Sequence, residues 1–148
     1  MNKNNVFFEG KGHFKPLEQA DIPIIVAAFA AIGWDKQAAL YQQYLREQAA
    51  GQRLVWVAFA ETVFVGYVTL KWQSDYPFFQ AEGIPEINDL NVLPPFRNQG
   101  VGSKLLDLAE AAAQNKSTCV GLGVGLYADY GPAQRLYVNE VMFLMVVV

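Results

Sequence analysis

Cysteine and histidine are scarce in this sequence, and their scarcity excludes two kinds of structure. Cys119 is the only cysteine among 148 residues, so no disulfide can form within the chain. With His13 as the only histidine, the sequence also lacks the four nitrogen and sulfur ligands of a structural zinc site. We therefore expect no bound metal and a reducing, cytoplasmic location.

Basic clusters and long apolar segments are missing as well. Lysine and arginine number 11 against 14 acidic residues, the net charge is −3, and the basic residues form no run. We therefore do not expect nucleic acid as a partner. The N-terminal segment lacks the apolar core of a signal peptide, and the apolar stretch at 22–34 is shorter than the roughly 20 residues that span a membrane. We expect no membrane association either.

The sequence does contain enough apolar material for a folded domain. Hydrophobic residues make up 53% and aromatic residues 14% of the chain, which favours a single domain over residues 1–148. The periodicity predicts the order β-α-α-β-β-β-α-β-α-β, an α/β (α+β) fold with a mixed sheet flanked by helices. Asp21 is expected to cap the first helix, and residues 74–85 to form a loop. The expected strands are 6–16, 53–60, 62–72, 86–92, 117–130 and 141–148, and the expected helices are 21–32, 36–50, 104–115 and 131–137.

One short stretch combines two glycines and an arginine at the start of an expected helix. In "LPPFRNQGVGSK", residues 93–104, a strand turns through two prolines and delivers Arg97, Gly100 and Gly102 to the helix N-terminus. Unpaired N–H groups and the positive end of the helix dipole converge there and attract phosphate. The glycines remove side chains that would keep a diphosphate from those N–H groups, and Arg97 adds a permanent positive charge. A plain tight turn is the alternative reading of the same spacing.

The wider frame around this stretch resembles the GNAT superfamily of acyl-CoA-dependent N-acyltransferases. The frame reads Leu-x-Val-x-Pro-x-x-Arg-x-x-Gly-x-Gly from Leu90 to Gly102, and a second block, "PAQRLY", follows at 132–137. The resemblance covers nearly the whole chain and implies the GNAT fold, mostly antiparallel and with its last strands incomplete here. It also implies acetyl-CoA as co-substrate, with the diphosphate at the helix N-terminus and the thioester carbonyl polarised by the strand backbone. The residues implied in cofactor binding are Leu90, Asn91, Val92, Arg97, Asn98, Gln99, Gly100, Val101, Gly102, Ser103, Tyr130, Ala133 and Tyr137.

Three residues are candidates for proton transfer in the implied reaction. Tyr137, at the position of the family's tyrosine, would protonate the departing thiolate. Glu86 is the first candidate for the base that deprotonates the amine, because it lies six residues before Val92, as in the histone-acetylating branch of the superfamily. Asp89 is the second candidate. Strand alternation places the two carboxylates on opposite faces unless a bulge intervenes, and a surface carboxylate is the alternative reading for both.

The sequence departs from the family pattern at two places. Tyr130 stands where many relatives carry an asparagine that binds the cofactor arm. After Tyr137 the relatives continue with a glycine, an aromatic residue and two strands, whereas this chain reads "VNEVMFLMVVV". We expect a frameshifted or prematurely ended reading frame, which the coding DNA would test. The apolar residues 141–148 are expected to form an edge strand covered by the fifth strand or by a second copy of the chain in a homodimer.

The predicted function is transfer of an acetyl group from acetyl-CoA to a primary amine of a small molecule. The acceptor would be a polyamine, an amino acid or an aminoglycoside-like compound. Acetylation of a protein N-terminus or lysine is a second enzymatic reading. A third reading is a catalytically impaired module that binds acyl-CoA, because the changed C-terminus removes part of the expected substrate wall.

Overall fold

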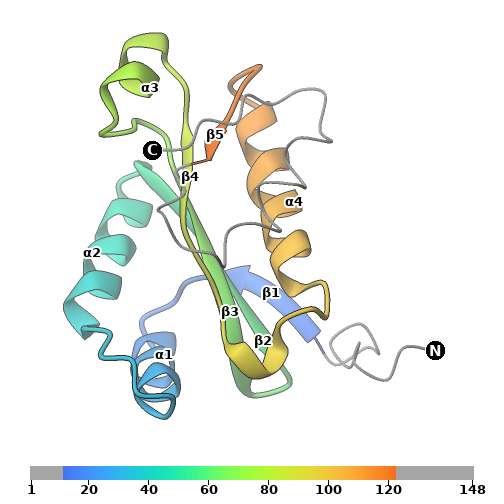
Figure 1. Ribbon diagram of the computed structural model, residues 1–148. Helices are drawn as coiled ribbons and strands as arrows, with labels where there is room; N and C mark the ends of the chain where they lie inside the picture. Colours follow the sequence, from blue (N-terminus) through green and yellow to red (C-terminus); the bar gives the residue numbers. More distant parts are fainter. Residues whose placement is uncertain (1–11, 123–148) are drawn as a thin grey trace.

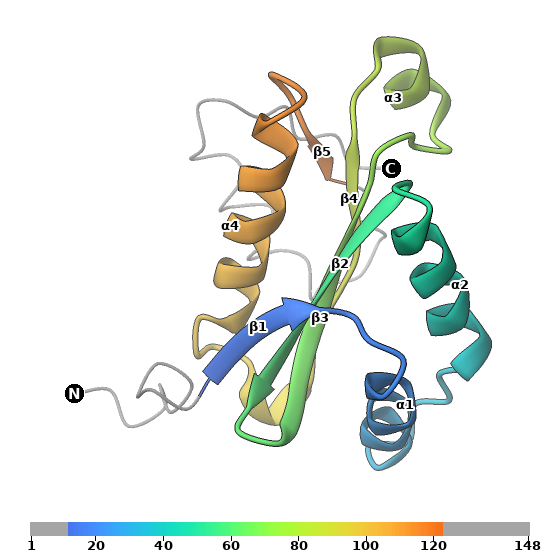
Figure 2. The ribbon, with the colours of Figure 1, turned by 180° about the vertical axis from the view of Figure 1, so that it is seen from behind.

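The computed structural model describes residues 12–122, which form a five-stranded sheet with helices on both faces. The strands are β1 (Gly12–Pro16), β2 (Arg53–Ala60), β3 (Val63–Lys71), β4 (Glu86–Val92) and β5 (Gly121–Leu122). The helices are α1 (Asp21–Ala30), α2 (Ala38–Ala49), α3 (Pro77–Glu82) and α4 (Val101–Gln114), with a 3-10 turn at Pro94–Phe96. Figures 1 and 2 show α1 and α2 on one side of the sheet and α4 on the other.

The sheet has the strand order β1-β2-β3-β4-β5. The first three pairings are antiparallel, and β4 pairs with β5 in parallel through Glu86 with Gly121 and Ile87 with Leu122. A parallel neighbour requires a crossover connection, and α4 lies in the segment between these two strands. The predicted fold class, a mixed and mostly antiparallel sheet flanked by helices, is confirmed.

The face under α1 and α2 holds an aromatic-rich core. Residues of β2 and β3 that alternate toward this face meet the apolar stripes of the two helices. The buried members of this cluster are Leu17, Ile22, Ile25, Phe29, Tyr41, Tyr44, Val55, Val57, Phe59, Phe64, Tyr67 and Leu93. Three of them are tyrosines, and a buried hydroxyl needs a hydrogen-bond partner, so this core must also contain polar groups.

The opposite face is aliphatic and is covered by α4. The buried members of this cluster include Val65, Val68, Leu70, Ile87, Val101, Leu105, Leu106 and Ala109. The helix begins at Val101, three residues before the expected start at Lys104. The earlier start follows from Gly100, whose left-handed conformation (φ +84°) ends the preceding turn and allows Val101 to enter the helix directly.

Asp21 does not cap α1 as its position in the sequence predicts. The N-cap is Ala20, and Asp21 is the first helical residue. Its Oδ2 accepts the backbone N–H of Glu18 at 2.9 Å and a bond from Lys15 Nζ at 2.5 Å. The carboxylate therefore closes the turn before the helix and joins it to β1, while the N–H groups of Asp21 and Ile22 donate to the carbonyls of Glu18 and Gln19.

The segment expected to be a loop, residues 74–85, contains the short helix α3. Pro77 opens the helix and Gly83, with φ +67°, ends it. Tyr76 and Phe78 are exposed, whereas Phe79 is fully buried. The Phe79 ring lies where a side chain at residue 121 would point, since a Cβ on Gly121 would come within 2.3 Å of that ring. The predicted loop was wrong because a six-residue helix is too short to show a periodicity of its own.

Several expected elements fall on residues 1–11 and 123–148, outside the described part of the chain. These are the start of the first strand, the strand after Leu122, the helix at 131–137 and the edge strand at 141–148. Between residues 12 and 122, no helix is both long enough and apolar enough to cross a lipid bilayer.

Candidate functional site

The N-terminus of α4 lies directly after the end of β4, with a tight turn between the two. Asn98 (φ +62°) and Gly100 (φ +84°) both adopt the left-handed conformation in this turn. The helix ladder begins with Lys104 N donating to the Gly100 carbonyl at 3.1 Å, so the N–H groups of residues 101–103 have no partner inside the helix. As far as residues 12–122 show, no side chain caps them. These N–H groups and the positive helix end can bind a phosphate.

Gly102, the second residue of α4, is not required by packing. A Cβ atom at this position would lie 3.7 Å from Val92 Cγ2, which is an ordinary van der Waals contact. Glycine is also a poor helix former, so the fold itself would favour another residue. The lack of a side chain at Gly102 leaves the N–H groups at the helix start uncovered, as the sequence analysis expects of a phosphate site.

Arg97 connects the end of β4 to the start of α4. Its Nε donates to the Val92 carbonyl at 2.9 Å, and its guanidinium carbon lies 5.9 Å from the centre of the Trp34 ring. The side chain therefore places a permanent positive charge next to the turn that precedes α4. Part of its hydrogen-bonding capacity holds the strand end in place.

The backbone of Val92 faces away from β3. Leu93 N donates to the Val65 carbonyl at 2.9 Å, and Val92 lies opposite Gly66. Because the bonding direction alternates along an antiparallel ladder, the N–H and C=O of Val92 point to the other side of β4. The bond from Arg97 to the Val92 carbonyl fits this direction. As far as Leu122, β5 pairs only with Glu86 and Ile87, so Val92 lies beyond the described β4–β5 pairing.

A β-bulge in β4 brings the two candidate carboxylates to the same face. The register with β3 shifts between Thr69, opposite Asn88, and Tyr67, opposite Asn91, so that two residues of β4 oppose Val68. Asp89, inside the bulge, has φ +52°. The extra residue turns Asp89 to the α2 side of the sheet. Strand alternation places Glu86 on that side too, so the bulge puts both carboxylates on one face.

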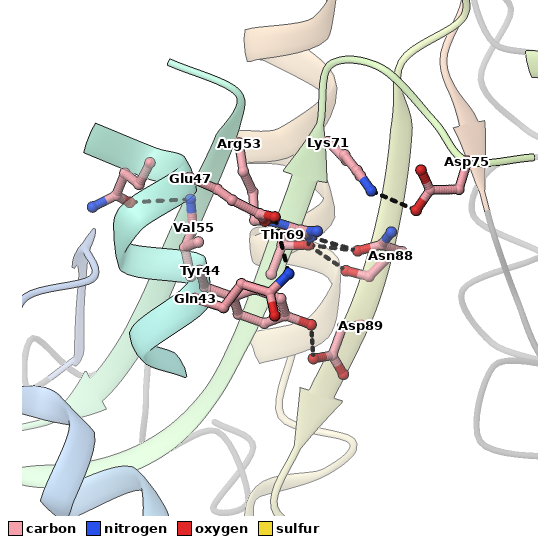
Figure 3. A network of polar contacts seen from close by, with 11 residues as sticks. Gln43, Tyr44, Glu47, Arg53, Val55, Thr69, Lys71, Asp75, Asn88 and Asp89 are labelled. Atoms are coloured by element: carbon pink, nitrogen blue, oxygen red, sulfur yellow. Dashed lines mark hydrogen bonds and ion pairs between the residues drawn. The ribbon is translucent and has the colours of Figure 1, made fainter. Parts of the chain in front are cut away.

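The Asp89 carboxylate is held by three hydrogen bonds. Its Oδ2 accepts from the hydroxyls of Tyr44 and Tyr67, each at 2.7 Å, and its Oδ1 accepts from Asn91 Nδ2 at 2.8 Å. The residue is partly exposed, whereas Tyr67 is fully buried. Figure 3 shows Tyr44 on α2 reaching across to Asp89 on β4. A negative charge is therefore fixed at a partly exposed position on the α2 side of β4.

The tyrosine hydroxyls around Asp89 remain protonated at neutral pH. Burial raises the pKa of Tyr67 well above its usual value, and the charge of Asp89 raises it further. Burial and then Asp89 raise the pKa of Tyr44 in the same way. Tyr41 donates to the Tyr67 hydroxyl at 3.3 Å, and burial raises the Tyr41 pKa to about 12. All three hydroxyls therefore act as donors: Tyr41 donates to Tyr67, and Tyr67 and Tyr44 each donate to Asp89.

Glu86 lies in a different setting at the start of β4. It is buried, with 9% of its surface exposed, and its Oε1 accepts a short hydrogen bond from the Ser74 hydroxyl. Ser74 in turn accepts the backbone N–H of Tyr76, just before α3. At about 3.3 Å per strand residue, Glu86 is on the order of 20 Å along β4 from Val92. Among the described residues, Glu86 is thus tied to the α3 segment.

The residues that surround Asp89 were not selected as site residues from the sequence. In the sequence, Tyr44 falls in the expected helix 36–50 and Tyr67 in the expected strand 62–72. The one signal in the sequence was that both are tyrosines on core-facing positions, where a hydroxyl needs a polar partner. Nothing in the sequence indicates that this partner is Asp89.

Three of the selected residues lie outside the described part of the chain. These are Tyr130, Ala133 and Tyr137, all in the segment that begins at residue 123. Their roles in holding the cofactor and protonating the thiolate stay predictions. The remaining selected residues lie on β4, on the turn that leads into α4 and in the first turn of α4.

The chain is similar to acetyltransferases of known structure. One is an N-acetyltransferase from Staphylococcus aureus Mu50, at 15% identity and a TM-score of 0.67, with 86% of this chain and 82% of that chain covered. A second is an aminoglycoside acetyltransferase from an uncultured soil metagenomic sample, solved with trehalose, at 20% identity and a TM-score of 0.65 over 95% of both chains. A third is a predicted acetyltransferase from Clostridium acetobutylicum, solved with acetyl-CoA, at 14% identity and a TM-score of 0.62, with 87% of this chain and 90% of that chain covered.

These likenesses establish the fold, and the sequence establishes the family. A search of curated protein sequences gives no match. The sequence profile of the acetyltransferase (GNAT) family matches residues 25–139, which is most of the chain and includes β4, the turn and α4. The chain therefore belongs to the GNAT acetyltransferase family and is an acyltransferase.

Proposed function

We propose that the protein transfers the acetyl group of acetyl-CoA to a primary amine of a small molecule. The observation that carries the proposal is the open N-terminus of α4 beside a strand whose backbone at Val92 points out of the sheet. With its diphosphate bound at the N-terminus of α4, acetyl-CoA would extend along β4 past Val92. The similar protein from Clostridium acetobutylicum, solved with acetyl-CoA, supports this choice of co-substrate.

In this proposal the turn before α4 holds the diphosphate of acetyl-CoA. The N–H groups of residues 101–103 donate to the phosphate oxygens, and the backbone of 98–100 lines the turn. The positive charge of Arg97 lies next to it. No side chain beyond these is needed, because helix dipole and N–H groups together provide the attraction.

The acetyl thioester would lie against the outward edge of β4. The neutral amine attacks the carbonyl carbon, the carbonyl oxygen gains negative charge, and the Val92 N–H stabilises that charge. The C–S bond then breaks and the acetyl group stays on the amine nitrogen. The thiolate of coenzyme A leaves and takes a proton, for which the resemblance to the family offers Tyr137. A thiol has a pKa of about 8.5, so it leaves readily.

Asp89 is the carboxylate that we propose for the acceptor amine. It is partly exposed and three residues from Val92, whereas Glu86 is buried and bonded to Ser74. A carboxylate has about four acceptor positions, and residues 12–122 occupy three of them, which leaves one position on Oδ1 for an N–H of the amine. The proton that the amine loses on acetylation would pass to this carboxylate or to water beside it.

The acceptor that we propose is a small cationic amine. The aminoglycoside acetyltransferase that is similar over 95% of this chain supports an acceptor with several amino groups. A fixed negative charge at Asp89 attracts such a compound and holds one of its amines next to the thioester.

A charge placed at Gly102 tests the diphosphate site. Gly102→Glu puts a carboxylate at the second residue of α4, where it repels a diphosphate but suits the helix, because glutamate is a better helix former and favours the positive helix end. We expect the free protein to keep or raise its melting temperature and to lose the stabilisation by acetyl-CoA. That stabilisation is about 2.7 kcal/mol at a ligand concentration 100 times the Kd.

Gly102→Gln is the matched control, because it adds the same volume without the charge. We expect Gly102→Gln to lose only the part of the acetyl-CoA response that depends on a bare glycine, and Gly102→Glu to lose more because of its charge, as measured by thermal shift and by calorimetry. Equal responses of wild type and Gly102→Glu would mean that the diphosphate does not bind at α4.

Release of free thiol across a panel of amines tests the transfer reaction. Polyamines, amino acids, aminoglycosides and a lysine peptide are each incubated with acetyl-CoA and the protein. Release with a small cationic amine supports the proposal, and release only with the peptide assigns a protein acceptor. Stabilisation by acetyl-CoA with no release for any amine would favour a binding module, and no response at all would remove the cofactor assignment.

A further inference from the structure

The β4 bulge is held by a buried arginine on β2. Arg53 has 5% of its surface exposed, and its Nη1 donates to Thr69 Oγ1 at 2.6 Å and to Asn88 Oδ1 at 3.0 Å. The Thr69 oxygen lies 3.0 Å from the Asn88 backbone carbonyl and 2.6 Å from Asn88 Oδ1, so its single hydrogen is directed at Asn88. Figure 3 shows these contacts converging from β2, β3 and β4.

The arginine is itself fixed by α2. Its Nε donates to Glu47 Oε1 at 2.6 Å, and its guanidinium carbon lies 4.3 Å from the centre of the Tyr44 ring. Burial opposes the charge of Glu47, but hydrogen bonds from Arg53 and Gln43 and the charge of Arg53 keep its pKa below the usual value. The Arg53 Nε thus forms an ion pair with Glu47, and its Nη1 donates to Thr69 and Asn88.

Asn88 is the last residue before the left-handed Asp89. A left-handed conformation costs a non-glycine residue energy, and it persists only where the surroundings hold it. Thr69 contacts both the backbone carbonyl and the side chain of Asn88, so it fixes the position of Asn88 at the start of the bulge. Thr69 is fully buried, which excludes water as a competitor for these bonds.

The bulge decides which way the end of β4 faces. Ile87 belongs to the α4-side core, and Leu90 and Val92 pack against the same core. Strict alternation from Ile87 would instead turn Leu90 and Val92 to the α2 side. Without the extra residue Val92 would also pair with Val65, and its N–H would point into the ladder with β3. The outward N–H of Val92 therefore depends on the bulge.

We propose that Arg53 is a positioning residue for acyl transfer: acting through Thr69 and Asn88, it holds the β4 bulge in the register that points the Val92 N–H out of the sheet. The inference rests on the proposed function, because it assigns Arg53 to the placement of the amide that stabilises the thioester oxyanion. Arg53 does not touch the cofactor in this arrangement. It acts through the buried Thr69 and the partly exposed Asn88.

Thr69→Val is the first test, because valine keeps the shape of threonine and removes the hydroxyl. We expect kcat, with the best amine of the panel, to fall at least about tenfold, since a misplacement of about 1 Å can cost that much or more. The Kd for acetyl-CoA should stay within about twofold, because α4 holds the diphosphate independently of the bulge. Thr69→Ser, which restores the hydroxyl, should recover kcat.

Two further variants separate positioning from loss of stability. Ile25→Val removes one buried methyl group from α1 and no hydrogen bond, and it costs about 0.5–1.5 kcal/mol of stability, so it serves as the matched control. Arg53→Lys keeps the charge next to Glu47 but cannot bond Glu47, Thr69 and Asn88 in one plane. We expect Arg53→Lys to lower kcat as Thr69→Val does and Ile25→Val to leave it within about twofold of wild type.

A second readout does not depend on catalysis. The backbone amide signals of residues 89–92 in a nitrogen–proton correlation spectrum should move in Thr69→Val and Arg53→Lys, return in Thr69→Ser and stay in place in Ile25→Val. Unmoved signals, or a loss of kcat no larger than that of Ile25→Val, would overturn the inference. If the wild type releases no thiol with any amine, the proposed function fails, and the amide signals alone decide whether Arg53 holds the bulge.

Discussion

Asp89 is a partly exposed carboxylate to which the hydroxyls of buried tyrosines donate. Its Oδ2 is bonded by two tyrosines that come from different elements, Tyr44 from α2 and Tyr67 from β3. Each phenol is locked in place by its own packing, since Tyr44 and Tyr41 meet edge to face, as do Tyr41 and Tyr67. The carboxylate therefore has a fixed position, which a proton acceptor needs.

Tyr44→Phe should lower the rate of acyl transfer more than Tyr41→Phe. Both variants remove a buried hydroxyl and keep the ring, and each should cost about 1 kcal/mol of stability. Of these two tyrosines, Tyr44 alone donates directly to Asp89, whereas Tyr41 donates to Tyr67. We expect kcat to fall at least about tenfold in Tyr44→Phe and about twofold in Tyr41→Phe, with steady-state kinetics and urea unfolding measured in parallel.

Equal losses of kcat in the two variants would mean that the hydroxyls matter only for stability. Asp89→Asn provides the internal standard, because it removes the charge and keeps the shape. Its kcat should be the lowest of the three variants. An Asp89→Asn protein with wild-type kcat would remove Asp89 from the reaction and return Glu86 as the candidate base.

Site residues differ in how far the sequence could reveal them. Gly100 was predictable, because a left-handed turn before a helix selects glycine, and the φ of +84° shows this need. The bonds from Tyr44 and Tyr67 to Asp89 were not, because the three residues lie on separate elements and only the fold brings them together. Asp89 was found as a carboxylate on a strand, but its face depended on a bulge that no local pattern announces.

At the scale of elements, the junction of β3, β4 and α4 depends on glycines on both sides of Val92. A Cβ on Gly66 would lie 2.6 Å from the Asn91 carbonyl oxygen and 3.2 Å from Val92 Cα, both backbone atoms of β4. A Cβ on Gly102 would meet only the end of the Val92 side chain at 3.7 Å. The strand thus approaches β3 as closely as backbone atoms allow and leaves room on the side of the helix.

Gly66→Ala should lower both stability and kcat, whereas Gly102→Ala should not lower stability. The methyl group at residue 66 must push β4 away at Asn91 and Val92, which we expect to cost about 1–3 kcal/mol and to lower kcat at least about tenfold. Gly102→Ala should raise stability by up to about 1 kcal/mol through helix propensity. Thermal unfolding and thiol-release kinetics measure both effects. A Gly66→Ala protein as stable and active as wild type would show that β4 can move away from β3 at Asn91 and Val92 without loss of function.

The elements that the sequence predicted well are those with a long, regular pattern. The hairpin strands β2 and β3 and the helix α2 lie within two residues of their expected bounds, because alternation and helical spacing run through their whole length. The short helix α3 was missed, although Pro77 and Gly83 mark its two ends. Aromatic residues in a row, such as Phe78 and Phe79, suit a loop, a strand or a helix until a tertiary contact decides.

For the whole molecule, the sheet separates two cores of different character. The α4 side is aliphatic, and the α2 side carries three buried tyrosines, an arginine and part of a glutamate. The buried phenols on the α2 side make the free energy of unfolding depend on pH. The tyrosines around Asp89 are therefore the groups whose ionisation at high pH should destabilise the protein.

Stability should fall as the pH rises above about 10. Burial raises the pKa of Tyr41 to about 12, and burial with the charge of Asp89 raises those of Tyr44 and Tyr67, against a usual value of 10.0. A group whose pKa is higher in the folded state stabilises the protein fully below its unfolded pKa. Above pH 10 the unfolded chain loses this proton first, so the free energy of unfolding declines with pH until the folded pKa is passed.

Tyr41→Phe should flatten this decline between pH 10 and 12, because it removes one of the three groups, with a contribution of about 2 kcal/mol across that interval. Urea unfolding at a series of pH values measures the slope, and phenolate absorbance reports the ionisation directly. Tyr76→Phe, at an exposed ring next to α3, is the control. If Tyr41→Phe and wild type lose stability in parallel above pH 10, the phenol of Tyr41 ionises as easily in the folded protein as in the unfolded chain, and the hydroxyl chain to Asp89 is open to water.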